Sequence, residues 1–128
     1  MALTKKERIK KYGEVFTPPK IVKQMVDMIE PDVSKPETTV LEPACGTGNF
    51  LVELLERKLA RCESDEERIT ALTSLYGVEI QNDNTLICRT RMIMRMPEHL
   101  REKAKEIVNR NILTGNFLKP EGIWFLEN

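Results

Sequence analysis

The sequence predicts an α/β domain: a parallel sheet of three to four strands with helices on both faces, preceded by N-terminal helices. Two observations lead to this class. Short apolar runs recur at 39–43, 74–80 and 111–118, and they are separated by helix-length stretches whose apolar residues repeat every three to four positions. Strands joined through helices pair in parallel, with right-handed crossovers.

The N-terminal segment, residues 1–38, is predicted to be helical. Thr4 and Glu7 have the spacing of a capping box, which predicts a short basic helix. Thr17 precedes two prolines and a helical apolar pattern, so we expect it to be the N-cap of a second helix that ends before Pro31. The apolar positions of this second helix are Ile21, Val22, Met25, Val26 and Ile29.

The remaining residues, 39–128, are predicted to form the βαβ core of a single domain. Ser64 and Glu67 have capping-box spacing and begin a short helix ahead of the second strand. The sequence KPEG then forms a turn, and IWFLE at 123–127 is a candidate fourth strand. In chain order we expect strands at 39–43, 74–80 and 111–118, and longer helices at 49–62, 82–96 and 98–110.

Composition describes a globular chain without a strong overall charge. Of its 128 residues, 20 are basic and 20 acidic, and 41% are hydrophobic. Basic residues gather at 1–12 and 89–110, which permits phosphate contacts, although solvated helix faces have the same pattern. No apolar run approaches the roughly 18 residues of a membrane span and no signal peptide is evident, so we expect a cytoplasmic protein. Three separated cysteines and one histidine, His99, do not make a zinc site.

The stretch LEPACGTGNFL places two glycines between a predicted strand and a predicted helix. Without Cβ atoms, the backbone at Gly46 and Gly48 lets a ligand lie directly against it, and the next helix directs its free N–H groups there. In open α/β sheets, ligands bind at the carboxyl ends of the strands. Glu79 ends the second predicted strand and Asn116 and Phe117 follow the third, so we expect one rim to carry them all.

Three classes of nucleotide-like ligand are candidates for this loop. A phosphate-binding P-loop requires GxxxxGK[ST], and the lysine is absent here. A dinucleotide fingerprint requires a third small residue where this chain has Leu51, which makes it a weak match. S-adenosylmethionine (SAM) requires neither, because it has no pyrophosphate. Glu42 is placed to bind its amino group, and the two oxygens of Glu79 can accept bonds from its ribose hydroxyls.

Four motifs of the sequence resemble those of N6-adenine DNA methyltransferases, in the branch whose cofactor motifs precede the catalytic motif. They are GEVFTPP, LEPACGTGNFL, YGVEI and ILTGNFL, and they extend from Gly13 to Leu118. The resemblance implies a partial Rossmann-like SAM-methyltransferase fold, SAM as the cofactor and DNA as a partner. In the last motif the family commonly has Asp, whereas this chain has Asn116, which can bond to an adenine edge but lacks the charge.

The resemblance also assigns residues to the cofactor. From the methionine end, through the centre and the ribose, to the adenine they are Phe16, Thr17, Pro18, Glu42, Ala44, Gly46, Gly48, Glu79, Ile80, Asn116 and Phe117.

The catalytic motif of that family, Asn- or Asp-Pro-Pro-aromatic, has no counterpart in the sequence. Pro18 and Pro19 precede the first strand and are followed by lysine, and Asn128 would stand at the first position of the motif if 123–127 is a strand. We therefore expect the chain to stop before the catalytic motif and to hold no catalytic residue and no metal. The expected function is the SAM-binding portion of a restriction-modification adenine methyltransferase, which transfers methyl only when a catalytic partner segment completes it.

The alternative is a non-catalytic SAM-binding or self-associating regulatory module. A truncated sheet leaves strand edges to cover, and a homodimer can cover them. The first function predicts that the chain alone binds SAM without transferring methyl, so absence of SAM binding would remove it and leave the self-associating module.

Overall fold

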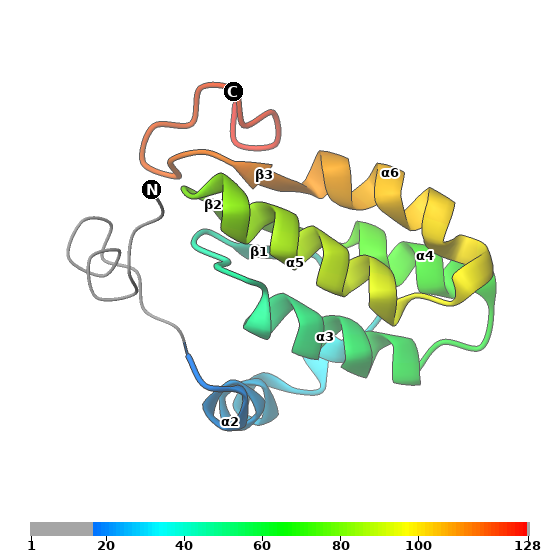
Figure 1. Cartoon of the computed structure of the whole chain (residues 1–128). Coiled ribbons are helices and arrows are strands. Elements are labelled where there is room, and N and C mark those ends of the chain that lie inside the picture. Colours follow the sequence, from blue (N-terminus) through cyan, green and yellow to red (C-terminus); the bar gives the residue numbers. More distant parts are fainter. Residues whose placement is uncertain (1–16, 128) are drawn as a thin grey trace.

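The computed structural model describes residues 17–127, so the predicted basic helix, Phe16 and Asn128 lie outside the described residues. The chain alternates strands and helices, as expected (Figure 1). Short 3-10 helices, η1 and η2, cover Asp32–Ser34 and Glu98–Leu100. The main elements are α2 (Pro19–Ile29), β1 (Val40–Glu42), α3 (Asn49–Ala60), α4 (Asp65–Thr73), β2 (Leu75–Glu79), α5 (Asn82–Arg95), α6 (Arg101–Asn111) and β3 (Ile112–Thr114).

The three strands form one parallel sheet in the order β1-β2-β3. Val40 of β1 pairs with Leu75 of β2, and Gly77 of β2 pairs with Ile112 of β3. The predicted α/β class, its parallel sheet and its first three strands are confirmed. None of the described helices has the length and apolar content needed to cross a membrane.

The main core lies between the sheet and the helices α3 and α5. Alternate residues of a strand face opposite sides, so Leu75 and Gly77 share the face of β2 that meets α3. A Cβ atom on Gly77 would lie 2.9 Å from Leu51 Cδ1 and 3.0 Å from Cys45 Sγ. The missing side chain therefore lets the start of α3 and the loop before it, residues 43–48, pack close to the strand. We call this loop the glycine loop.

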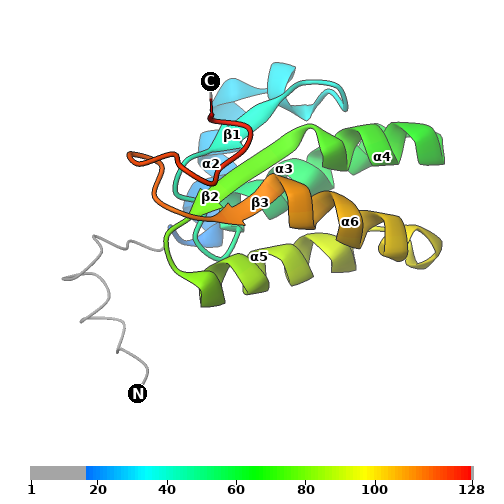
Figure 2. The ribbon, with the colours of Figure 1, turned by 90° about the horizontal axis from the view of Figure 1, so that it is seen from above.

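The opposite face of β2 is covered by the C-terminal segment, residues 116–127, in place of a helix (Figure 2). The ring of Tyr76 packs against Trp124 and Phe125, with centroids 6.3 and 5.1 Å apart. Trp124 Nε1 also donates a 2.6 Å hydrogen bond to the carbonyl of Arg110. Residues 123–126 face the sheet as a coil and leave β1 as a strand edge in the described residues.

The predicted fourth strand at 123–127 is wrong, because this segment consists of turns. Its N–H groups donate locally: Ile123 N to Pro120 O, and Leu126 N to Ile123 O, each at 2.9 Å. These bonds use N–H groups that a strand ladder would need, while the apolar side chains still reach the sheet.

The N-cap prediction for α2 is wrong by one residue. Pro18 occupies the N-cap position without a side-chain cap, and Pro19 begins the helix. The carbonyl of Thr17 instead accepts a 2.8 Å hydrogen bond from Asn49 Nδ2, at the start of α3. At α4 the predicted cap is confirmed, since Ser64 Oγ accepts from Glu67 N at 3.1 Å.

A fully buried lysine of α3 anchors the chain that enters β1. Lys58 Nζ donates to the carbonyls of Lys35 and Thr38 at 2.6 and 2.7 Å, and lies 3.5 Å from that of Pro36. Burial lowers the pKa of the Lys58 ammonium to about 8. The segment between η1 and β1 is thus held by a helix and not by a neighbouring strand.

Candidate functional site

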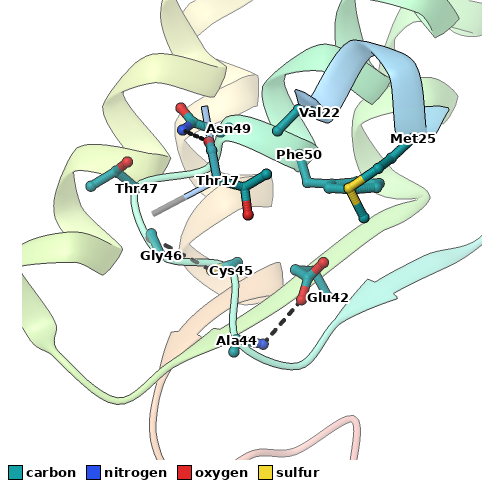
Figure 3. Close-up of a pocket in the computed structure, with 10 residues that line it drawn as sticks. All are labelled: Thr17, Val22, Met25, Glu42, Ala44, Cys45, Gly46, Thr47, Asn49 and Phe50. Atoms are coloured by element: carbon teal, nitrogen blue, oxygen red, sulfur yellow. Dashed lines mark hydrogen bonds between the residues drawn. The ribbon is translucent and has the colours of Figure 1, made fainter. Parts of the chain in front are cut away.

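A pocket of about 180 Å³ opens at the carboxyl end of β1. The glycine loop lies on one side, with Met25 of α2 and Phe50 of α3 on the other, and Thr17 between them (Figure 3). The pocket therefore combines bare main chain, polar groups and an apolar wall. Its lining consists of Thr17, Val22, Met25, Glu42, Ala44, Cys45, Gly46, Thr47, Asn49 and Phe50.

The two glycines of the loop serve different purposes. Both have positive φ, +57° at Gly46 and +92° at Gly48. A Cβ atom on Gly46 would meet no atom within 4 Å, so its main chain faces open space beside the pocket. A Cβ atom on Gly48 would lie 2.7 Å from Cys88 Sγ, so this glycine is required by packing against α5. Gly46 can contact a ligand, whereas Gly48 positions the loop.

Glu42 brings a half-buried carboxylate into the pocket from the end of β1. Its Oε1 accepts a 3.3 Å hydrogen bond from the N–H of Ala44. Burial raises the pKa of Glu42, and the bond from Ala44 only partly opposes this effect. No salt bridge joins this carboxylate to a lysine or arginine among residues 17–127. A desolvated carboxylate without a cation is a suitable partner for an ammonium group.

Glu79 connects the glycine loop to the start of α5. Its side chain is buried, and its Oε1 accepts a 3.2 Å hydrogen bond from the N–H of Gly46. Its Oε2 accepts from Gln81 N at 2.9 Å and from Asn84 Nδ2 at 3.2 Å. A carboxylate has about four lone-pair sites, so acceptor capacity remains. These bonds show that Glu79 supports the glycine loop, and its expected contact with a ribose stays a prediction.

The expected adenine side is arranged differently, because Ile80, Asn116 and Phe117 do not line the pocket. Ile80 and Phe117 are 46% and 40% exposed. Asn116 Oδ1 accepts a 2.9 Å bond from the N–H of Leu118, and the two residues belong to a tight turn after β3. Pro18 is exposed at the start of α2. Of the predicted residues that the structure describes, those in the pocket are Thr17, Glu42, Ala44 and Gly46.

Several pocket residues were not predicted as such. The sequence assigns Val22 and Met25 to the apolar face of a helix, and their periodicity gives no sign that they also line a pocket. Phe50, at the start of α3, lines it as well. Asn49 and Arg91 form polar contacts across the loop, and no local pattern indicates their partners.

Cys45 lies in the loop but is a structural thiol. Its side chain is buried, and hydrogen bonding with Cys88 together with burial raises the pKa of Cys45. A thiol with a raised pKa is protonated at neutral pH and is therefore a poor nucleophile.

Comparisons with known proteins place these features in context. A family model described as N-6 DNA Methylase matches residues 2–119. The type II restriction enzyme and methyltransferase RM.BcgI of Heyndrickxia coagulans is 42% identical over 84 residues, which are 65% of this chain and 13% of that protein. The methylase subunit of the type I restriction enzyme EcoEI of Escherichia coli is 32% identical over 113 residues, 88% of this chain and 21% of that protein.

A similar arrangement occurs in a crystal structure from Vibrio vulnificus YJ016, of a modification subunit assigned to a type I restriction enzyme. The match has a TM-score of 0.53 and 29% sequence identity, and it covers 78% of this chain and 19% of that one. The chain thus spans between 13% and 21% of the length of these relatives.

Proposed function

Because the chain belongs to the N-6 DNA methylase family, we propose that it forms the SAM-binding portion of a restriction-modification DNA adenine N6-methyltransferase. One observation carries this proposal: the pocket at the end of β1 combines the open main chain of Gly46 with the desolvated carboxylate of Glu42. The first can lie against a ligand and the second can bind an ammonium group. SAM has such a group on its methionine part.

The residues fit the cofactor in the following way. Glu42 would accept hydrogen bonds from the ammonium group, and the backbone at Ala44 and Gly46 would contact the methionine part. Met25 and Phe50 offer apolar surface in the same pocket. When bound, SAM supplies a methyl group on a positively charged sulfur.

The adenosine end of the cofactor would lie toward the ends of β2 and β3. Glu79 would accept bonds from the ribose with its remaining lone pairs. Ile80 and Phe117 would contact the adenine faces, and Asn116 its edge. These roles follow from the motifs of the family, and the exposure of Ile80 and Phe117 leaves their side chains accessible to a ligand.

Methyl transfer to DNA requires further groups. A target adenine must leave the base stack, and acceptors must bind its amino group. The family's motif for these acceptors does not occur in the 128 residues. We propose that a catalytic segment or partner subunit supplies it, together with the DNA-recognition surface.

Calorimetric titration of the chain with SAM tests the cofactor site. We expect saturable binding of SAM and of S-adenosylhomocysteine, and much weaker binding of ATP, because the loop lacks the lysine that holds phosphates in a P-loop. Absence of both heat and a thermal shift at millimolar SAM would reject the proposal.

A second assay tests the need for a partner. Transfer of tritiated methyl groups to adenine-containing DNA should be undetectable with this chain alone and should appear when a segment with an Asn-Pro-Pro-Tyr motif from a relative is added. Turnover by the chain alone would contradict the division of roles.

A further inference from the structure

We propose that Arg91 of α5 is a positioning residue for the pocket, which acts through the side-chain amide of Asn49 and holds the glycine loop and the Thr17 segment in one arrangement. The identity of the ligand rests on the proposed function. The contacts themselves do not.

A chain of three hydrogen bonds joins these elements. Arg91 Nη1 donates to the carbonyl of Thr47 at 2.8 Å and to Asn49 Oδ1 at 2.9 Å. Asn49 Nδ2 donates in turn to the carbonyl of Thr17 at 2.8 Å. The bonds connect α5, the glycine loop and the residue ahead of α2, which are far apart in the sequence. Thr17, Thr47 and Asn49 all line the pocket.

The partners of Asn49 fix the direction of its amide. A guanidinium group can only donate, and a carbonyl group can only accept. The oxygen of Asn49 must therefore face Arg91 and its nitrogen must face Thr17, since the reverse orientation would oppose like groups on both sides. Arg91 thus determines which end of the amide is offered to Thr17.

This contact matters for the pocket because, among the described residues, no strand pairing holds Thr17. Residues 17–39 precede the sheet, and α2 packs on α3 through Val22 and Val26. This apolar stripe and the ion pairs that Arg57 of α3 forms with Asp27 and Glu30 hold α2 along its length and at its end, but they do not involve Thr17. The bond from Asn49 to Thr17 sets how far Thr17 lies from the glycine loop, and hence the width of the pocket at this point (Figure 3).

The substitution Arg91→Met tests the inference, with Arg95→Met as the matched control. Arg95 lies on the same helix and pairs with Glu56, away from the loop. We expect Arg91→Met to weaken the binding of SAM about tenfold, the effect of losing one or two hydrogen bonds. Arg95→Met should change it by less than about twofold, as for an exposed ion pair.

Adenosine serves as a second probe, because it lacks the methionine part. Its affinity should be the same in the wild-type chain, Arg91→Met and Arg95→Met. An equal loss of adenosine and SAM binding in Arg91→Met would indicate general damage to the fold and would overturn the positioning role.

A measurement without ligand separates this inference from the proposed function. In ¹⁵N–¹H spectra of the chain alone, the side-chain amide signals of Asn49 should shift in Arg91→Met and stay in place in Arg95→Met. Unchanged signals in Arg91→Met would reject the inference, whatever SAM does. Failure of the wild-type chain to bind SAM would reject the proposed function and, with it, the role of Arg91 toward that ligand.

Two further variants cover the case in which Arg91→Met does not fold. Arg91→Lys keeps the charge, but its ammonium does not reproduce the planar fork of the guanidinium, so we expect an intermediate loss of SAM affinity. In a double-mutant cycle of Arg91→Lys with Asn49→Ala, the losses should be less than additive, because both variants disturb the same chain of bonds. Full additivity, or an Arg91→Lys variant indistinguishable from wild type, would contradict the proposal.

Discussion

The two ends of the candidate cofactor site are built in different ways. On the methionine side, four parts of the chain are tied together: Gly46 of the glycine loop bonds to Glu79 at the end of β2, and Asn49 bonds to both Thr17 and Arg91. On the adenine side, Asn116 uses its side chain within its own turn, and Phe117 stands 40% exposed.

This difference indicates that the methionine side is the more rigid of the two. A site that is held in place before the ligand arrives loses little conformational entropy on binding, whereas exposed side chains must be ordered at that moment. We therefore expect substitutions on the methionine side to change both stability and affinity. Substitutions on the adenine side should change affinity alone, and by less.

The largest expected effect comes from Gly48→Ala, which should break the ordered side. The new Cβ would lie 2.7 Å from Cys88 Sγ at a φ of +92°. Backbone strain and overpacking together should lower the free energy of unfolding by about 3 kcal/mol, measured by urea denaturation. The matched control is Gly46→Ala, where nothing lies within 4 Å and only the cost of a positive φ, about 1 kcal/mol, is expected. Equal losses in the two variants would contradict this account of the loop.

Glu79→Gln should have the next largest effect. The new NH₂ group would face an N–H group at either carboxylate position, so one of the bonds from Gly46 or from Gln81 is lost. We expect the free energy of unfolding to fall by about 2 kcal/mol. The exposed Glu121→Gln should stay within about 0.5 kcal/mol of wild type. A Glu79→Gln variant as stable as wild type would show that the loop does not depend on this carboxylate.

Glu42→Gln tests the affinity for the ligand on the same side. Loss of a charged acceptor for the ammonium group should weaken SAM about thirtyfold and leave adenosine binding unchanged, as measured by calorimetry. If adenosine and SAM weaken together, Glu42 does not bind the methionine end.

The pH dependence of Glu42 provides a second check. Burial raises the pKa of this carboxyl group in the folded chain above its ordinary value of 4.5. The folded state then binds more protons than the unfolded state from pH 4.5 upward to the raised pKa, so the stability of wild type relative to Glu42→Gln should fall as the pH rises through this range. The affinity for SAM should change in the opposite direction, since only the ionised carboxylate binds an ammonium group. A SAM affinity independent of pH in this range would exclude the carboxylate as the partner.

The smallest effect is expected on the adenine side, from Phe117→Ala. Loss of a stacking ring should weaken SAM and adenosine alike, by about fivefold, without a measurable change in the denaturation midpoint. Leu118→Ala, at an 85% exposed neighbour, should leave both affinities unchanged. A clear loss of stability in Phe117→Ala would mean that this side is structural after all.

Local patterns in the sequence predicted the first three strands, most helices and the position of the pocket. The alternation of apolar runs and the glycine pair depend on neighbouring residues, and the parallel order then brings the strand ends together. The prediction of a fourth strand was wrong because an apolar run such as 123–126 is equally typical of a strand and of a coil packed on a sheet. The roles of Arg91 and Asn49 could not be predicted from the sequence, because their partners are set by the tertiary structure and no sequence pattern indicates them.

The position of Lys58 has a consequence for how short β1 can be. An ammonium group from α3 gives the carbonyls of residues 35 and 38 the hydrogen bonds that a second strand would otherwise provide. The helix thus substitutes for a sheet neighbour just where the sheet begins, and three paired residues are enough to align this strand with the next. Shortening the lysine should therefore disturb the entry of the strand first and its paired residues only afterwards.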